Sequence, residues 1–266
     1  MGNAASAEAS ALLKVEQQGK VLTIGLNRPA KRNALNDGII LAIGDCFAHL
    51  PENIGAVVIH GIGDHFSSGL DLSELTEHDA TEGLRHSQMW HRVFDRIQYS
   101  RVPVIAALKG AVIGGGLELA CAAHIRVAEP SAYFALPEGQ RGIFVGGGGS
   151  VRLPRLIGVA RMTDMMLTGR VYSATEGASY GFSQYLTDEG NAYHKAMELA
   201  AKVASNAPLT NFAVLQALPM IAEANPQTGL LMESLMATVA QSDKEAKRRI
   251  RAFLEHKTAK VKPGKT

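Results

Sequence analysis

The alternation of apolar and polar residues in the first half of the chain predicts a sheet. Two short alternating runs, 12–16 and 21–26, flank the turn-forming segment Gln17-Gln18-Gly19-Lys20 and predict a β-hairpin. The continuous apolar run at 56–60 is typical of a strand that is buried on both faces. Three further strands are expected, at 104–108, 125–128 and 132–135.

Helical periodicity fills most of the remaining chain. Residues 36–50 and 73–100 have it, and Trp90, Phe94 and Ile97 recur at a spacing typical of a helix face in a core. Beyond residue 150 the sequence predicts only helices, several of which end at glycine, at 151–157, 160–168, 173–179, 189–205, 208–222, 229–240 and 244–256. The order predicts an α/β protein whose β-rich core precedes an all-helical region. We divide the chain into a flexible leader (1–10), a core (11–172), a helical region (173–257) and a disordered tail (258–266).

The segment 112–150 contains two glycine clusters that flank two acidic residues. Gly114-Gly115-Gly116 follows a predicted strand and precedes helix-forming residues, so it predicts a tight turn and a helix N-terminus. Such a terminus attracts negative charge. Glu118 in the first turn could simply stabilise the helix dipole. Glu138, however, lies between an apolar strand and a glycine-containing loop, where a solvated Glu is unusual, and the pair therefore indicates carboxyl chemistry.

Other kinds of catalytic or binding motif are weaker. The triple glycine lacks the G-x-G-x-x-G spacing of a dinucleotide site and the Lys-Ser/Thr ending of a P-loop. The nine histidines show no metal-ligand spacing, and Cys46 and Cys121 form no C-x-x-C pair. No serine lies in a G-x-S-x-G elbow. We therefore expect neither a metal nor a separate cofactor.

Four segments in the same order and spacing resemble the crotonase (enoyl-CoA hydratase/isomerase) superfamily. The segments are Asn27–Leu35 (Asn-Arg-Pro-x-x-Arg-Asn-Ala-Leu), Ser68–Leu72 (Ser-Gly-x-Asp-Leu), Gly114–Ala120 (Gly-Gly-Gly-x-Glu-Leu-Ala) and Phe134–Glu138 (Phe-x-x-Pro-Glu). The resemblance covers roughly residues 12–257 and implies a ββα spiral core with a C-terminal all-helical region.

The resemblance also implies a reaction, the hydration of the C2=C3 double bond of an acyl-CoA thioester. Both Glu118 and Glu138 would take part, Glu118 as the base toward water and Glu138 as the donor of the C2 proton, and the reverse assignment of the two stays open. The backbone N–H groups of Leu70 and Gly115 would hold the thioester oxygen, and the backbone of Gly146 would lie beside the water. Contacts to CoA, which is part of the substrate, are expected from Lys31, Arg32, Ala34, Ser68, Gly69, Asp71, Leu72 and Phe253.

Two alternatives stay open. One is another crotonase-type lyase or isomerase, such as an aromatic acyl-CoA hydratase-lyase or a carnitinyl-CoA-type dehydratase. The other is a non-catalytic CoA- or RNA-binding relative. The net charge of +2 gives no electrostatic case for nucleic acid, and the presence of both acids argues against lost catalysis. Two departures from the family pattern are His124, where Asp is common, and Phe144-Val145 before the second glycine cluster. They bear on a local hydrogen bond and on the shape of the pocket mouth.

Composition adds expectations about location and assembly. The 266 residues contain no run of eighteen apolar residues, and both cysteines fall in apolar helical patterns typical of buried thiols. We expect a cytoplasmic protein that binds no membrane. Apolar residues cover much of the helices between 208 and 240 and need to be buried somewhere. Together with the resemblance, this favours a homotrimer or a dimer of trimers.

Overall fold

The protein, a computed structural model, is described over residues 12–74 and 79–255. It divides into two compact units, Met1–Ala204 and Ser205–Thr266. The predicted leader and the predicted tail lie outside the described residues, as does His256 at the end of the last predicted helix. None of the helices within the described ranges is long and apolar enough to cross a membrane.

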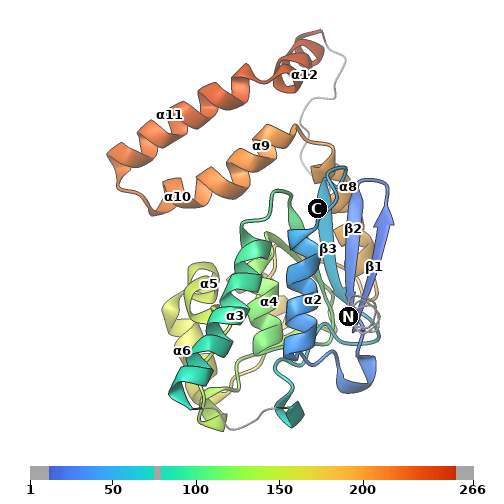
Figure 1. The fold of residues 1–266 in the computed structure, drawn as a ribbon, viewed down its shortest axis with the longest axis vertical. Helices are drawn as coiled ribbons and strands as arrows, with labels where there is room; N and C mark the ends of the chain where they lie inside the picture. Colours follow the sequence, from blue (N-terminus) through green and yellow to red (C-terminus); the bar gives the residue numbers. More distant parts are fainter. Residues whose placement is uncertain (1–11, 75–78, 256–266) are drawn as a thin grey trace. The chain divides into compact units, whose positions relative to one another are not determined.

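A six-stranded sheet forms the frame of the first unit (Figure 1). The predicted hairpin is confirmed, because β1 (Leu13–Gln18) pairs antiparallel with β2 (Val21–Leu26). The remaining strands run parallel to β2 in the order β3 (Ala56–Gly61), β4 (Val104–Leu108), β6 (Ile125–Ala128) and β9 (Tyr185–Leu186). The sequence did not predict β9, which has only two residues.

Alternate residues of the buried strands point to opposite faces of this sheet. Val57 and Ile59 belong to the larger apolar core, with α2 (Asp37–Ala48) and α3 (Ala80–Gln98). Ala56 and Val58 belong instead to a smaller core under α8 (Ala192–Ala204), which is formed with Ala196 and Leu199. The helices α2 and α8 thus cover the two faces, which explains why β3 reads as a continuous apolar run.

A smaller sheet carries the glycine-rich segment. It is made of β5 (Ala111–Ile113), β7 (Tyr133–Ala135) and β8 (Tyr172–Ser173), of which only β7 was predicted. Immediately after β5 the chain turns at Gly114 into α4 (Gly115–Ala122), as the triple glycine predicts. The helices α5 (Gly149–Ile157), α6 (Val159–Thr168) and α7 (Ala174–Tyr180) follow, with 3₁₀ turns elsewhere at η1 (Pro29–Lys31), η2 (Leu72–Glu74) and η3 (Gly139–Arg141).

The boundary between the two units differs from the division made on sequence. The sequence predicts a helical region from residue 173 onward, whereas α7 and α8 belong to the first unit of the structure. The physical reason is that α8 buries Ala192, Ala196 and Leu199 against the main sheet. A helical pattern alone does not reveal which surface a helix covers.

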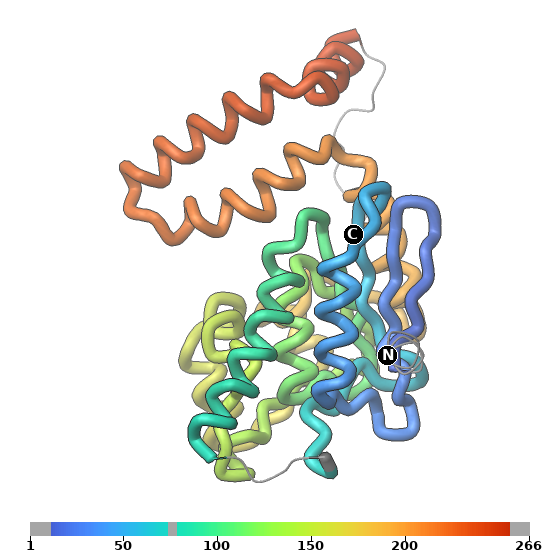
Figure 2. Tube along the Cα trace, in the orientation of Figure 1, coloured from blue at the N-terminus to red at the C-terminus, as the bar shows by residue number. Residues whose placement is uncertain are grey.

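The second unit is a helical hairpin extended by one more helix (Figure 2). Its first arm is α9 (Pro208–Phe212), the π-turn η4 (Ala213–Ala217) and α10 (Leu218–Glu223). Pro219, at the start of α10, lacks an N–H and disfavours the ordinary helical bond there, which accounts for the π-turn. The second arm is α11 (Pro226–Ser242), followed by α12 (Lys244–Leu254).

Candidate active site

A cavity of about 430 Å³ opens in the first unit beside the N-terminus of α4. Segments far apart in the sequence line it: the loop after β3, helix α3, the glycine turn before α4, and residues 138–147. The residues that line it are Ser68, Gly69, Leu70, Leu72, Gly83, His86, Ser87, Trp90, Gly114, Gly115, Glu118, Glu138, Arg141, Ile143, Phe144, Val145, Gly146 and Gly147. Both predicted acids are therefore in one pocket.

Glu118 lies on α4 and is held by backbone donors. Its side chain is only 4% exposed. The Oε1 atom accepts hydrogen bonds from Gly147 N at 2.9 Å and from Gly149 N at 2.7 Å. Burial raises the pKa of Glu118 above its ordinary value, while these two N–H groups and the charge of Arg152 oppose the rise. The second glycine cluster is thus a cradle for this carboxyl group.

Glu138, at the end of the segment after β7, has a different environment. It is 8% exposed, and its buried Oε2 meets no hydrogen-bond partner among the described residues. Burial, aided by the charge of Glu118, raises the pKa of Glu138 to about 7. Gly114 has φ +51°, and a Cβ there would lie 2.6 Å from Glu138 Oε1. Glycine at 114 is therefore required both by the turn and by the approach of this carboxyl group.

Two backbone N–H groups flank the pocket near the acids. Gly115 is the first residue of α4, so its N–H has no partner within the helix. Leu70 forms a parallel bridge with Leu35 through Gly69 O and Asp71 N, which leaves its own N–H on the opposite side. A Cβ at Gly115 would lie 3.5 Å from Leu70 N, which places the two groups next to each other. The arrangement suits one shared oxygen acceptor.

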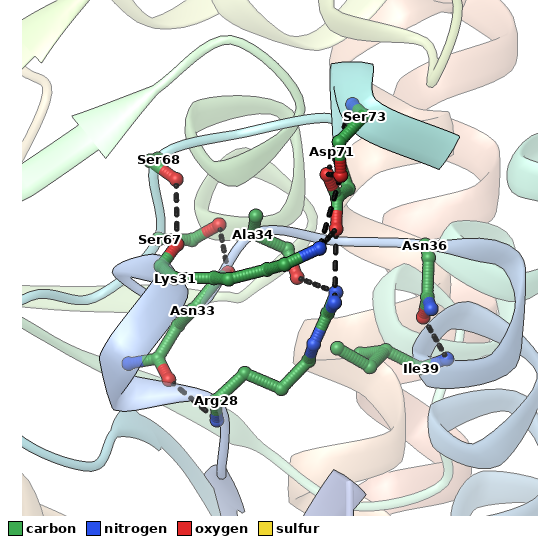
Figure 3. Close-up of polar contacts among 10 residues, drawn as sticks. All are labelled: Arg28, Lys31, Asn33, Ala34, Asn36, Ile39, Ser67, Ser68, Asp71 and Ser73. Atoms are coloured by element: carbon green, nitrogen blue, oxygen red, sulfur yellow. Dashed lines mark hydrogen bonds and ion pairs between the residues drawn. The ribbon is translucent and has the colours of Figure 1, made fainter. Parts of the chain in front are cut away.

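An ionic cluster fixes the loop that carries Leu70 (Figure 3). Asp71 is 6% exposed and bonds Arg28 Nη2 and Lys31 Nζ, each at 2.9 Å. Ser73 adds its hydroxyl at 2.6 Å and its N–H at 3.1 Å. The Ser73 hydroxyl, together with the two cations, holds the pKa of Asp71 well below its ordinary value. These contacts therefore join the segment Asn27–Leu35 to the segment Ser68–Leu72, and they fix the loop that carries Leu70 beside the pocket.

Hydrogen bonds from a left-handed turn complete this junction (Figure 3). Arg32 and Asn33 both have positive φ, at 50° and 55°. This conformation directs Asn33 inward, where its Nδ2 donates to the carbonyls of Ile62 and His65. The Ser67 hydroxyl donates to Asn33 O, and Ser68 N donates to Arg32 O. Asn tolerates left-handed backbone better than most residues, which explains its place in the motif.

The other walls of the pocket are mainly apolar. Trp90 is buried, lines the cavity and donates through Nε1 to Asp37 Oδ1 at 3.3 Å. It stacks edge-on against Phe94, so the stripe that predicted a core is confirmed, and Trp90 in addition lines the pocket. Phe144 is 69% exposed at the rim, whereas Val145 is buried. The departure from the family pattern at Phe144-Val145 thus falls on the pocket wall.

His124 makes two hydrogen bonds in place of those expected of an Asp. Its Nδ1 accepts from Val104 N at 2.9 Å, and its Nε2 lies 2.9 Å from Gln98 O. These partners select the neutral ring with the proton on Nε2. Burial lowers the pKa of His124, which agrees with a neutral ring. The residue connects the end of α3 to β4 and is not among the residues that line the pocket.

The structure brings together most of the residues singled out on sequence. Ser68, Gly69, Leu72 and Gly146 line the pocket, with Ser87 Oγ donating to Gly146 O at 2.7 Å. Lys31, Ala34 and Asp71 instead belong to the junction, where Ala34 O accepts from Arg28 Nη1. Arg32 is exposed, and Phe253 lies on α12 of the second unit.

Sequence reasoning missed the partners of these residues. Gly147 and Gly149, which hold Glu118, and Arg152, which contacts Gly147 O, were not singled out. The run of four glycines at 146–149 was the available signal. Within residues 12–74 and 79–255, no group of three His, Cys, Asp or Glu side chains could hold a metal ion.

Comparison with known proteins identifies the family. The sequence pattern of the enoyl-CoA hydratase/isomerase family matches residues 16–263. The chain belongs to this family. The 2,3-dehydroadipyl-CoA hydratase of Escherichia coli K12 is 34% identical over 254 residues, or 94% of this chain and 98% of the relative. The short-chain-enoyl-CoA hydratase of Clostridium acetobutylicum is 32% identical over 244 residues, 91% and 94% of the two chains.

Solved structures agree with the fold of the enoyl-CoA hydratase/isomerase family. A crystal structure from Rhodopseudomonas palustris CGA009, provisionally described as an enoyl-CoA hydratase, is 81% identical to this chain with a TM-score of 0.92. The alignment covers 95% of this chain and 98% of that one. The crotonase-like fold, with its C-terminal helical region, is therefore confirmed.

Proposed function

We propose that this protein is an enoyl-CoA hydratase, which adds water across the C2=C3 double bond of an α,β-unsaturated acyl-CoA thioester. One observation carries the proposal. Two buried carboxyl groups with different hydrogen-bonding environments line the same pocket, beside two adjacent backbone N–H groups. Hydration requires a polarised carbonyl, a base for water and an acid for C2, and these groups can supply all three.

The N–H groups of Leu70 and Gly115 would donate to the thioester oxygen. Negative charge builds on that oxygen as water attacks C3, so preorganised donors stabilise the enolate-like state. Glu118 takes a proton from the attacking water, and Glu138 gives a proton to C2. At the end of the reaction Glu118 is protonated and Glu138 is ionised, and exchange of protons with solvent restores both.

The unlike environments of the acids support this division of roles. Two N–H donors on Glu118 Oε1 favour its ionised form, which is the form a base needs. Glu138 has no donor at Oε2 and a pKa of about 7, so it keeps its proton up to neutral pH. Burial also raises the pKa of Glu118, so the division of roles rests on the hydrogen bonds: two donors held on one carboxyl group and an unpartnered buried oxygen on the other.

The family also contains isomerases, and these are the main alternative. Moving a double bond only removes a proton from one carbon and returns one to another, and it incorporates no water. The second carboxyl group, buried and directed at the same pocket, favours hydration. The mainly apolar walls formed by Trp90, Ile143 and Phe144 favour an apolar acyl chain. The names of the relatives extend from short-chain to dicarboxylic enoyl-CoA substrates.

A turnover screen in ¹⁸O-labelled water tests the proposal. The full chain is incubated with short, long, branched, aromatic and dicarboxylic enoyl-CoAs, and the products are analysed by mass spectrometry. A hydratase yields a 3-hydroxyacyl-CoA that contains one ¹⁸O atom. A product of unchanged mass with a shifted double bond would establish an isomerase instead, and no product from any member of the panel would refute the hydratase.

The CoA portion would bind over the junction formed by the first two motifs. Arg32 is an exposed cation there, and its carbonyl accepts from Ser68 N beside the pocket. Lys31 is already paired with Asp71, so Arg32 is the stronger candidate for a phosphate contact. Phe253 lies on α12 of the second unit and is 54% exposed, and the CoA contact that the family implies for it stays a prediction. CoA serves here as part of the substrate, with no separate cofactor.

Assembly into a homotrimer or a dimer of trimers is the accompanying proposal. Leu230, Leu231 and Leu235 on α11 are each more than 60% exposed in the single chain. Leaving such side chains in water is unfavourable, and a second copy of the chain is the partner that the family favours. Gel filtration with light scattering over a range of concentrations tests this. A fully active monomer at micromolar concentration would contradict it.

A further inference from the structure

Arg152 is a buried cation outside the pocket that contacts the cradle of Glu118. It lies on α5 and is 8% exposed. Its Nη1 donates to Gly147 O at 3.0 Å, and its Nη2 pairs with Asp95 Oδ1 at 2.6 Å. Its Nε donates to Gln98 Oε1 at 2.5 Å. One planar group thus joins the end of α3 to the second glycine cluster.

The carbonyl that Arg152 holds belongs to a residue whose N–H binds Glu118. Gly147 therefore receives Arg152 at its oxygen and gives its own N–H to Glu118 Oε1. Gly148 next to it has φ +94°, and a Cβ there would lie 2.3 Å from Arg152 Nη1. The guanidinium thus occupies the space that a side chain at 148 would need. The loop conformation and the arginine position require each other.

We propose that Arg152 is a positioning residue for the reaction, because its hold on Gly147 keeps the glycine cradle in the orientation that presents Glu118 to the attacking water. The proposal rests on the proposed function in that Glu118 is taken as the base. Arg152 itself does not line the pocket and touches no reacting atom. Its positive charge also favours the ionised form of Glu118, which is the form a base needs.

Glu118 has several charged or titratable neighbours, and these define the test. Arg152 acts on it from α5, Glu138 from the segment after β7, and Cys121 from its own helix α4. Asp95 on α3 contacts Arg152. Removing the guanidinium charge should raise the pKa of Glu118, whereas replacing it by an ammonium should preserve the charge but lose the fork of hydrogen bonds.

The experiment compares Arg152→Gln, Arg152→Lys and a matched control, Arg161→Gln. Arg161 is exposed on α6 and likewise donates to one helix carbonyl, Ile157 O at 2.8 Å. We expect kcat to fall about 10- to 100-fold in Arg152→Gln with little change in KM, since misplaced catalytic groups cost rates of that order. Arg161→Gln should keep the wild-type kcat.

A ¹³C-carboxyl NMR titration gives a readout that a purely structural role would not change. The protein is labelled at glutamate, and the Glu118 signal is assigned by its loss in Glu118→Gln. Its midpoint should rise in Arg152→Gln and stay at the wild-type value in Arg152→Lys, while kcat falls in both. If Arg152→Gln does not fold, the kcat of Arg152→Lys alone decides.

Two results would overturn the inference. One is a wild-type kcat in Arg152→Lys, because the set of hydrogen bonds that only a guanidinium can make would then be unnecessary for the reaction. The other is an Arg152→Gln protein that is folded and keeps both the kcat and the Glu118 midpoint of the wild type. A wild-type protein inactive on every enoyl-CoA would instead refute the proposed function, and the midpoint in Arg152→Gln would still report whether Arg152 controls Glu118.

Discussion

The buried carboxyl groups of the first unit have two opposite kinds of surroundings, which shift their pKa values in opposite directions. Asp71 has two cations and a serine around it, and its pKa is held well below its ordinary value. Glu138 has a buried oxygen without a partner among the described residues, and burial raises its pKa to about 7. Glu118 accepts from backbone donors in place of cations, and burial raises its pKa as well.

The comparison teaches how to tell a supporting acid from a reacting one. A carboxylate whose oxygens are paired with cations stays ionised near neutral pH, and its ion pairs hold loops together. A carboxyl group that is desolvated but incompletely satisfied can change its protonation state near neutral pH, and its unsatisfied atom remains open to a substrate. All three residues appear in family motifs, so the motif alone does not separate these roles. The local surroundings do.

The largest expected effect follows from replacing the reacting acids. Glu118→Gln and Glu138→Gln should each lower kcat by about 10²–10⁴-fold, because each removes one proton-transfer group. Binding of a CoA ester should survive, since neither side chain holds the nucleotide in the proposed arrangement. Steady-state kinetics and calorimetric titration measure the two quantities. Near-wild-type turnover in either variant would remove that residue from the mechanism.

The pH dependence of the rate is the next largest effect. Glu138 must be protonated to act as the acid, so kcat should fall about tenfold per pH unit above its pKa of about 7. The profile of the wild type is measured with the best substrate of the screen. In Glu138→Gln this alkaline limb should disappear from the residual rate. A limb that stays in place in that variant would assign it to another group.

Glu138 should also make the fold less stable as pH rises. Its folded pKa of about 7 lies above the ordinary value of 4.5, so the folded state favours the protonated form. Stability is therefore greatest below the ordinary value and is lost as pH rises toward 7. Glu138→Gln should be more stable than the wild type at pH 8, by roughly 2–3 kcal/mol, and similar at pH 4.5. Urea unfolding at the two pH values checks this, and equal stability at pH 8 would contradict it.

Asp71 provides the opposite case. Asp71→Asn should destabilise the fold by about 2 kcal/mol at pH 7, because two cations lose the carboxylate that they share. The contribution of Asp71 has the reverse pH dependence, since a depressed pKa gives stability that is lost as pH falls through it. Urea unfolding of Asp71→Asn and of Ser73→Ala, which removes only the hydroxyl partner, measures the difference. An Asp71→Asn protein as stable as the wild type would contradict the supporting role.

Much of this arrangement could be predicted from the sequence, because local signals are strong where the chain is regular. The hairpin, the buried β3 and β4 strands and the turn into α4 follow from apolar periodicity and from glycine placement. The family motifs placed both acids, Leu70 and Gly115 in one site, and all four line one pocket. Strands of two residues, such as β8 and β9, carry too little pattern to be recognised.

The sequence could not predict which residues of different motifs contact each other. Lys31 and Asp71 are forty residues apart, and nothing in either segment indicates that they pair. Lys31, for which the resemblance implies a contact to CoA, shares its charge with Asp71 in the structure. The same holds for Gly147 and Glu118, because the glycine run at 146–149 marks a loop without indicating which side chain that loop binds. Such long-range pairs are fixed by the packing of the whole unit.

The smallest expected effect separates the two adjacent cations, Lys31 and Arg32. Lys31 is 47% exposed, and Asp71 keeps Arg28 and Ser73 when it is removed, so Lys31→Met should cost about 0.2–1 kcal/mol of stability. Arg32 is also exposed but lies directly beside Ser68 at the pocket. If it contacts a CoA phosphate, Arg32→Ala should raise the Kd of a CoA ester several-fold more than Lys31→Met does. Calorimetric titration of both variants at two salt concentrations measures this, because a phosphate contact weakens as salt screens it. A larger loss of affinity in Lys31→Met would contradict this prediction. It would show that Lys31 breaks its ion pair with Asp71 when the substrate binds, and that the ionic cluster contacts CoA in addition to holding the loop.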